Sequence, residues 1–188
     1  KTPRQEAPGC SPWGSATPTE SVYFGVISLR SVRLIAFVAE LNGLKLWGTD
    51  IGNAYLESYT AESVMIVAGP EFGELAGLLL QIMRALYGLK SSGLRWAERL
   101  IIVLRLMGFF QCLADPCIWM RAKEDHYEYV GTYVDDLEIA SKHPESIIKQ
   151  LEKEHKFKLK GTGDMTYHLG VSFFRDPNGN LCQSAHRY

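Results

Sequence analysis

Tyr133-Val134-Asp135-Asp136-Leu137, in the second half of the 188-residue chain, places two acidic residues between apolar neighbours. Residues 127–133 before the pair and residues 137–140 after it have the composition of strands. We therefore predict a hairpin that carries two carboxylates at its tip. An isolated pair of aspartates is more often a polar turn, but apolar flanks on both sides favour a functional role for this pair.

Another acidic residue, Asp50, closes a predicted strand over residues 44–50. From this strand onward, the core elements follow the order strand, helix, strand, strand, helix, strand. That order is typical of the split βαβ, or ferredoxin-like, arrangement, so we predict an α+β fold. The first and third core strands are neighbours in such a sheet, which would bring Asp50 close to Asp135.

Hydrophobic periodicity supplies the remaining elements. It leaves residues 78–86 ambiguous between strand and helix, and Asp176-Pro177-Asn178-Gly179 reads as a turn. The predicted helices cover residues 22–41, 92–107 and 144–151, and the other predicted strands cover residues 64–68, 118–121, 157–160 and 167–174. The first helix is predicted from an apolar stripe with spacings of threes and fours, namely Val22, Val26, Leu29, Leu34, Phe37, Val38 and Leu41.

Converging carboxylates repel one another and stay ionised only when positive charge lies between them. Oxygen ligands of this kind favour Mg²⁺ or Mn²⁺ over zinc. Two such ions about 4 Å apart are the usual device for in-line attack at phosphorus. The three aspartates therefore point to phosphoryl-transfer chemistry.

Composition excludes several classes of protein and selects none. Twenty Lys and Arg against 21 Asp and Glu leave a net charge of -1, which by itself does not indicate a nucleic-acid partner. No apolar run reaches the ~18 residues of a membrane span, so we expect no membrane partner. Residues 1–19 are rich in Pro and Gly and predict an irregular lead-in without a signal peptide. Four unpaired cysteines predict reduced thiols in an intracellular protein.

Five motifs, in this order, resemble those of reverse transcriptases from the Ty1/copia branch of retrotransposons. The resemblance covers about residues 20–188. The motifs are TDIGNAYL at residues 49–56, LYGLKSSGLRW at residues 86–96, YVDD at residues 133–136, FKLKG at residues 157–161 and YHLG at residues 167–170.

The resemblance implies a right-hand polymerase palm, over about residues 44–56 and 92–188, with a partial fingers lobe over about residues 20–43 and 57–91. It also implies that Asp50, Asp135 and Asp136 are catalytic. These three carboxylates, with the Ile51 carbonyl, would bind two Mg²⁺ (or Mn²⁺) ions.

Further roles follow from the same resemblance. Tyr55 would crowd the sugar 2′ position of the incoming nucleotide, although a core tyrosine is the alternative. The other implied nucleotide-binding residues are Tyr87, Gly88 and Lys90, and the implied primer or template contacts are Tyr133, Arg95, Leu169 and Gly170.

The implied reaction is RNA-directed DNA polymerisation. The partners would be an RNA or DNA template-primer, deoxynucleoside triphosphates and the thumb, RNase H and integrase of a retroelement polyprotein. The alternative is a decayed or truncated remnant that keeps the fold and at most binds nucleic acid. Glu138 stands where an apolar strand residue is usual, and such a fourth carboxylate would either bind an ion or have a raised pKa.

Overall fold

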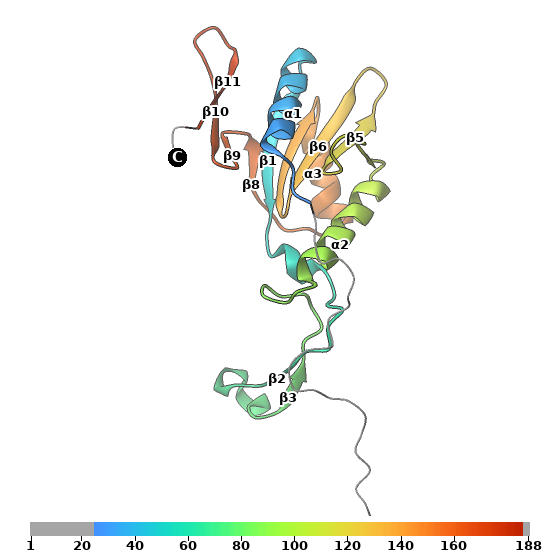
Figure 1. The fold of residues 1–188 in the computed structure, drawn as a ribbon, viewed down its shortest axis with the longest axis vertical. Coiled ribbons are helices and arrows are strands. Elements are labelled where there is room, and N and C mark those ends of the chain that lie inside the picture. The colour runs from blue at the N-terminus through green and yellow to red at the C-terminus, as the bar shows by residue number, and fades with distance from the viewer. Residues whose placement is uncertain (1–24, 186–188) are drawn as a thin grey trace, which may run out of the picture.

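A six-stranded antiparallel sheet forms the centre of the fold in a computed structural model that describes residues 25–185. The predicted lead-in over residues 1–19 lies outside the described residues. β1 lies between β7 and β8, so the first and third core strands are neighbours, as expected (Figure 1). In sheet order, the strands are β4 (Phe110–Gln111), β5 (Ile118–Ala122), β6 (Tyr127–Tyr133), β7 (Asp136–Ser141), β1 (Lys45–Ile51) and β8 (Leu159–Asp164).

Helices cover both faces of this sheet. α2 (Ser92–Leu106) and α3 (Pro144–Lys149), which a π-helical turn extends over Gln150–Glu154, pack on one face. α1 (Leu29–Leu41) packs on the other face. The sheet therefore separates two cores, and the fold is a mixed α and β arrangement.

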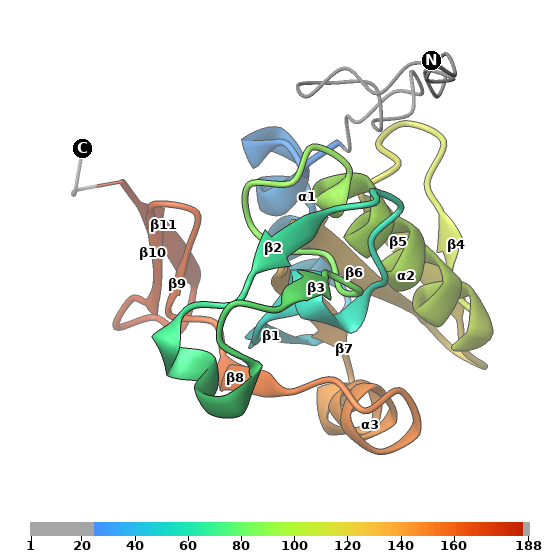
Figure 2. The ribbon, with the colours of Figure 1, turned by 90° about the horizontal axis from the view of Figure 1, so that it is seen from below.

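A second, three-stranded sheet adjoins the α1 side. It contains β9 (Tyr167–His168), β10 (Val171–Arg175) and β11 (Leu181–Ser184), and it projects to one side of the molecule (Figure 2). The prediction of one continuous strand over residues 167–174 is wrong, because Leu169 and Gly170 adopt positive φ values of 47° and 83° and reverse the chain. The predicted turn at residues 176–179 is confirmed, with Gly179 at φ 86°.

A small ribbon extends away from the sheet (Figure 1). It pairs β2 (Met65–Val67) with β3 (Leu79–Gln81), which places a strand in the ambiguous stretch. Short 3₁₀ helices lie at Ala54–Glu57 (η1) and Pro70–Leu75 (η2). Every residue of β2 is exposed, so the ribbon has little core of its own.

The first predicted helix is correct in type but wrong in its start and its buried face. It begins only at Leu29, because the Ser28 hydroxyl accepts the Ser31 N–H at 3.1 Å and caps the helix. Its buried residues are Ser31, Val32, Ile35, Ala36 and Ala39. The predicted apolar stripe is largely exposed, namely Leu29, Leu34, Phe37 and Leu41. Both faces of this helix are apolar, so periodicity could not tell which one packs.

Three further strands differ from prediction. β8 starts at Leu159 and runs to Asp164, later than the predicted 157–160, since Phe157 is buried in the core before the strand begins. The two-residue β4 and the strand β11 were not predicted. Within residues 25–185, no helix is both long enough and apolar enough to span a membrane.

Candidate catalytic site

Asp50 and Asp136 are directly opposite each other on β1 and β7. Their chain neighbours Ile51 and Leu137 are fully buried in the core beneath α2. Because successive side chains of a strand point to opposite faces, both aspartates lie on the α1 side. Sheet pairing thus brings these two carboxylates together.

The pKa values of both carboxyls report this crowding. Burial raises the pKa of Asp50, and the charge of Asp135 raises it further, while Lys160 opposes the change. Burial likewise raises the pKa of Asp136, followed by the charges of Asp135 and Asp50. The three predicted aspartates therefore form one electrostatic unit.

The turn between β6 and β7 holds Asp135. Val134 has a positive φ of 55°, and its carbonyl accepts the Trp96 indole N–H at 2.7 Å. The Ile51 N–H donates to the Asp135 carbonyl at 2.9 Å. Core side chains and the neighbouring strand thus fix the backbone at the tip. The proposed use of the Ile51 carbonyl as a metal ligand stays a prediction.

Oxygen donors are the ligand type that Mg²⁺ prefers, so the chemistry of this set fits such an ion. In the described part of the chain, however, no three His, Cys, Asp or Glu side chains are grouped closely enough to hold a metal. The carboxylates of Asp50 and Asp136 are the paired element of the site, and the full ligand set stays a prediction.

Two predicted nucleotide-binding residues lie against each other. The ring centroids of Tyr55 and Tyr87 are 4.4 Å apart. Burial raises the pKa of Tyr87, and the charges of Asp135, Tyr55 and Asp50 raise it further. This tyrosine pair therefore adjoins the aspartates.

Gly88 follows with a φ of 97°, a conformation that favours glycine. Lys90 is exposed, and it helps to lower the pKa of Glu62, after the larger effect of hydrogen bonds from Ser91. The Ser91 N–H and hydroxyl both donate to Glu62, at 2.8 and 2.7 Å. This contact joins the segment between η1 and β2, which contains Glu62, to the start of α2.

The four predicted primer or template residues are dispersed. Tyr133 is half-buried against the core on the α1 side, and Leu169 and Gly170 form the turn between β9 and β10. Arg95 is paired with Glu98 at 2.8 Å and lines a different groove, together with Arg84 and Arg99. The structure does not bring Arg95 to the aspartates.

Sequence reasoning gave Lys160 no role at the site and favoured a structural role for His168, in the YHLG motif. Lys160 is the β8 partner of Asp50, so Asp50 has Asp136 on one side and Lys160 on the other. A hollow of about 210 Å³ is lined by Asp50, Asp136, Lys160 and His168, among others. His168 is buried, which lowers its pKa to about 4. The FKLKG and YHLG motifs marked both residues, but nothing in the sequence showed that their strands reach the aspartates.

Glu138 is fully buried two residues beyond Asp136, and neither carboxylate oxygen has a hydrogen-bond partner in the described residues. Burial raises its pKa well above the ordinary value. Of the two expected consequences of a fourth carboxylate, the burial of Glu138 favours the raised pKa.

Comparison with known proteins agrees with the motifs. The profile of a family described as reverse transcriptase (RNA-dependent DNA polymerase) matches residues 15–187. The Retrovirus-related Pol polyprotein from transposon RE1 of Arabidopsis thaliana is 27% identical over 166 residues, which are 87% of this chain and 11% of that protein. A putative transposon Ty5-1 protein of Saccharomyces cerevisiae is 27% identical over 143 residues, 74% of this chain and 46% of that protein.

The chain thus spans from about a tenth to about half of the length of these relatives. RNA-directed DNA polymerisation is the activity of the family as a whole. The match over nearly all residues, together with Pol polyproteins as relatives, identifies the chain as a retrotransposon segment of Ty1/copia type that belongs to the reverse transcriptase (RNA-dependent DNA polymerase) family.

Proposed function

We propose that this chain carries the catalytic centre of an RNA-directed DNA polymerase. It would add deoxynucleotides to a primer 3′-hydroxyl, which attacks the α-phosphorus of the triphosphate and releases pyrophosphate. The observation that carries the proposal is the pairing of Asp50 with Asp136 across β1 and β7, with Asp135 beside them at the turn.

The six-stranded sheet would be the palm of this polymerase. The order β6-β7-β1-β8, with α2 and α3 on one face, supports a split βαβ palm over about residues 44–56 and 92–188. The β2–β3 ribbon would belong to a partial fingers lobe, over about residues 20–43 and 57–91.

Asp50, Asp135, Asp136 and the Ile51 carbonyl would hold two Mg²⁺ (or Mn²⁺) ions. When bound, such ions activate the attacking hydroxyl and neutralise charge on the triphosphate. Repulsion and burial already raise the pKa values of Asp50 and Asp136, so a cation between them would relieve an unfavourable arrangement.

Other residues would orient the substrates. Tyr55, backed by the Tyr87 ring, would crowd the sugar 2′ position and favour deoxynucleotides. Gly88 would let the backbone approach the base pair, and Lys90 would contact phosphate. Tyr133, Leu169 and Gly170 would contact the primer, and Arg95 would contact the primer or the template. The Pol polyprotein relatives support partners in cis, such as thumb, RNase H and integrase segments.

Primer extension on an RNA template, with Mg²⁺ and separately with Mn²⁺, tests the proposal. We expect the wild type to extend the primer and Asp135→Asn to lower the extension rate by a factor of at least about a hundred. Asp125→Asn is a matched control, because Asp125 is an exposed aspartate in the β5–β6 turn.

Absence of extension from a wild-type chain with a cooperative unfolding transition would contradict activity of this segment. That result would favour the alternative of a remnant that keeps the fold, and binding of a template-primer would then decide whether nucleic-acid affinity persists.

A further inference from the structure

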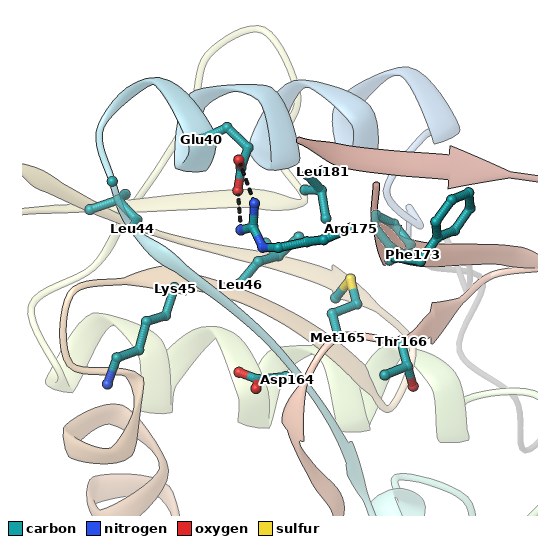
Figure 3. Close-up of a pocket in the computed structure, with 12 residues that line it drawn as sticks. Glu40, Leu44, Lys45, Leu46, Asp164, Met165, Thr166, Phe173, Arg175 and Leu181 are labelled. Carbon is teal, nitrogen blue, oxygen red and sulfur yellow. Dashed lines mark hydrogen bonds and ion pairs between the residues drawn. The ribbon is translucent and has the colours of Figure 1, made fainter. Parts of the chain in front are cut away.

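An ion pair joins the second sheet to α1. The Arg175 guanidinium on β10 contacts the Glu40 carboxylate through two N–O pairs, Nη2–Oε1 at 2.6 Å and Nη1–Oε2 at 2.9 Å (Figure 3). Arg175 Nη1 also donates to the Gly179 carbonyl at 2.7 Å, in the turn between β10 and β11. One side chain therefore ties a helix, a strand and a turn together.

Beneath this ion pair lies a hollow of about 490 Å³ between α1, β1 and β10 (Figure 3). The hollow interrupts side-chain packing between the second sheet and the rest of the fold, so apolar contact alone holds this side less firmly. Its apolar lining includes Leu44, Leu46, Met165, Phe173 and Leu181.

One wall of this hollow also borders the smaller hollow of the candidate catalytic site. Asp164, Met165 and Thr166 line it, and the same three residues line the smaller hollow that contains Asp50 and Asp136. His168, which follows in β9, also lines that smaller hollow. A displacement of the second sheet relative to α1 would therefore move one wall of the catalytic site.

We infer that the Glu40–Arg175 ion pair is a positioning element that holds residues 164–175 beside the catalytic carboxylates. The inference rests on the proposed function, because the segment matters for activity only if a primer end binds there. The two residues are positioning residues, since neither lines the hollow that contains Asp50 and Asp136.

Hydrogen–deuterium exchange of the amides of residues 166–175 tests the inference directly. Arg175→Ala should speed exchange about three- to tenfold, the range expected for one partly exposed, two-pronged ion pair. Arg175→Lys keeps the charge without the two-pronged geometry and should give an intermediate effect. The exchanged pair Glu40→Arg with Arg175→Glu should restore most of the protection.

Glu145→Ala is the matched control. It removes another exposed ion pair, Lys45–Glu145 at 3.0 Å, which joins β1 to α3, and Glu145 itself lines neither hollow. Exchange of residues 166–175 should be unchanged in this variant.

Primer-extension kinetics supply the functional measurement. In Arg175→Ala the KM for primer-template should rise about three- to tenfold while kcat stays within about twofold, since binding geometry is disturbed and the carboxylates are retained. The charge exchange should restore KM, which a general loss of stability would not do.

Wild-type exchange rates in Arg175→Ala would overturn the inference, and so would faster exchange with an unchanged KM. If the wild type gives no extension at all, the proposed function fails. Exchange and primer-template affinity then still decide whether the ion pair holds this segment in place.

Discussion

Glu128 and Glu138 lie on neighbouring strands of one sheet, and both are buried, with 3% and 0% of their surface exposed. Glu128 faces α2 and α3, where Arg121 Nε donates to it at 2.7 Å and the Ser141 hydroxyl donates at 2.7 Å. Glu138 faces α1 and has no such partner among the described residues. A buried glutamate is therefore hydrogen-bonded on one face of the sheet and lacks a partner on the other.

The Glu138 side chain has room on the sheet because glycines occupy the neighbouring positions on both adjacent strands. Its register partners are Gly131 on β6 and Gly48 on β1. A Cβ atom at Gly131 would lie 2.7 Å from Ile27 Cδ1, so the space beside Glu138 is already filled. The two glutamates thus differ in their surroundings: Glu128 on the α2 and α3 face is paired, whereas Glu138 on the α1 face, which also carries Asp50 and Asp136, has no partner among the described residues.

The largest change in stability should come from removing the ion pair between Arg121 and Glu128. Arg121→Met should lower the free energy of unfolding by about 3–5 kcal/mol, because the buried charge of Glu128 would lose its closest cationic partner and keep only Lys123, whose Nζ lies 3.8 Å away. Urea unfolding at pH 7 measures the loss. Glu128→Leu added to Arg121→Met should recover most of it, and a loss below about 1 kcal/mol would show that Glu128 is not electrostatically dependent on Arg121.

An intermediate effect is expected at His168, a buried residue on the α1 side whose Nε2 has no hydrogen-bond partner among the described residues. Its pKa is lowered from 6.5 to about 4 by burial, so the unfolded chain takes up the proton first. Its contribution to stability is complete above pH 6.5 and is lost as pH falls, by ~3 kcal/mol at pH 4. His168→Phe should remove this part of the acid sensitivity.

Unfolding midpoints at pH 7 and pH 4, in wild type and His168→Phe, measure the difference. The other charged residues that line the same hollow, Asp50, Asp136, Asp164 and Lys160, are present in both proteins, so the comparison isolates the effect of the imidazole. Equal pH dependence of the two proteins would contradict the buried, neutral state of His168.

The smallest effect, and one of opposite sign, is expected at Glu138. Glu138→Leu should raise the free energy of unfolding by about 1–3 kcal/mol at pH 8, since it removes a buried group without partners. The raised pKa means that wild-type stability falls as pH rises above the ordinary value of 4.5, so the gain should be smaller at pH 4.

Thermal unfolding of the wild type, Glu138→Leu and Glu138→Gln at the two pH values measures this gain. Glu138→Gln should lose the pH dependence and gain less. A destabilised Glu138→Leu would indicate that the carboxyl has a partner and that the two faces of the sheet do not differ as described.

Local sequence patterns were sufficient to predict those elements whose structure depends on residues close in sequence. The strand over residues 127–133 is confirmed with the predicted bounds, and the hairpin places Asp135 and Asp136 at its tip. The order of the elements predicted that β1 and β7 are neighbours and that Asp50 lies close to Asp135, whereas the residue directly opposite Asp50 is Asp136. Lys160 beside Asp50 depends on long-range register, which no local pattern carries.

Two other failures have a shared cause. The helix over residues 29–41 is apolar on both faces, so the choice of the Val32 face depends on which surface the sheet offers. The break at Leu169 and Gly170 depends on two positive φ values within an apolar run. In both places tertiary contacts decide between local options of similar energy.

The left-handed Val134 makes the β6–β7 turn depend on distant contacts. A β-branched residue adopts a φ of 55° only when its surroundings enforce it. The enforcing contacts come from Trp96 on α2 and, through Asp135, from Ile51 on β1. Local loosening of α2 would therefore release the turn that carries Asp135, while the pairing of Asp50 with Asp136 across β1 and β7 would persist.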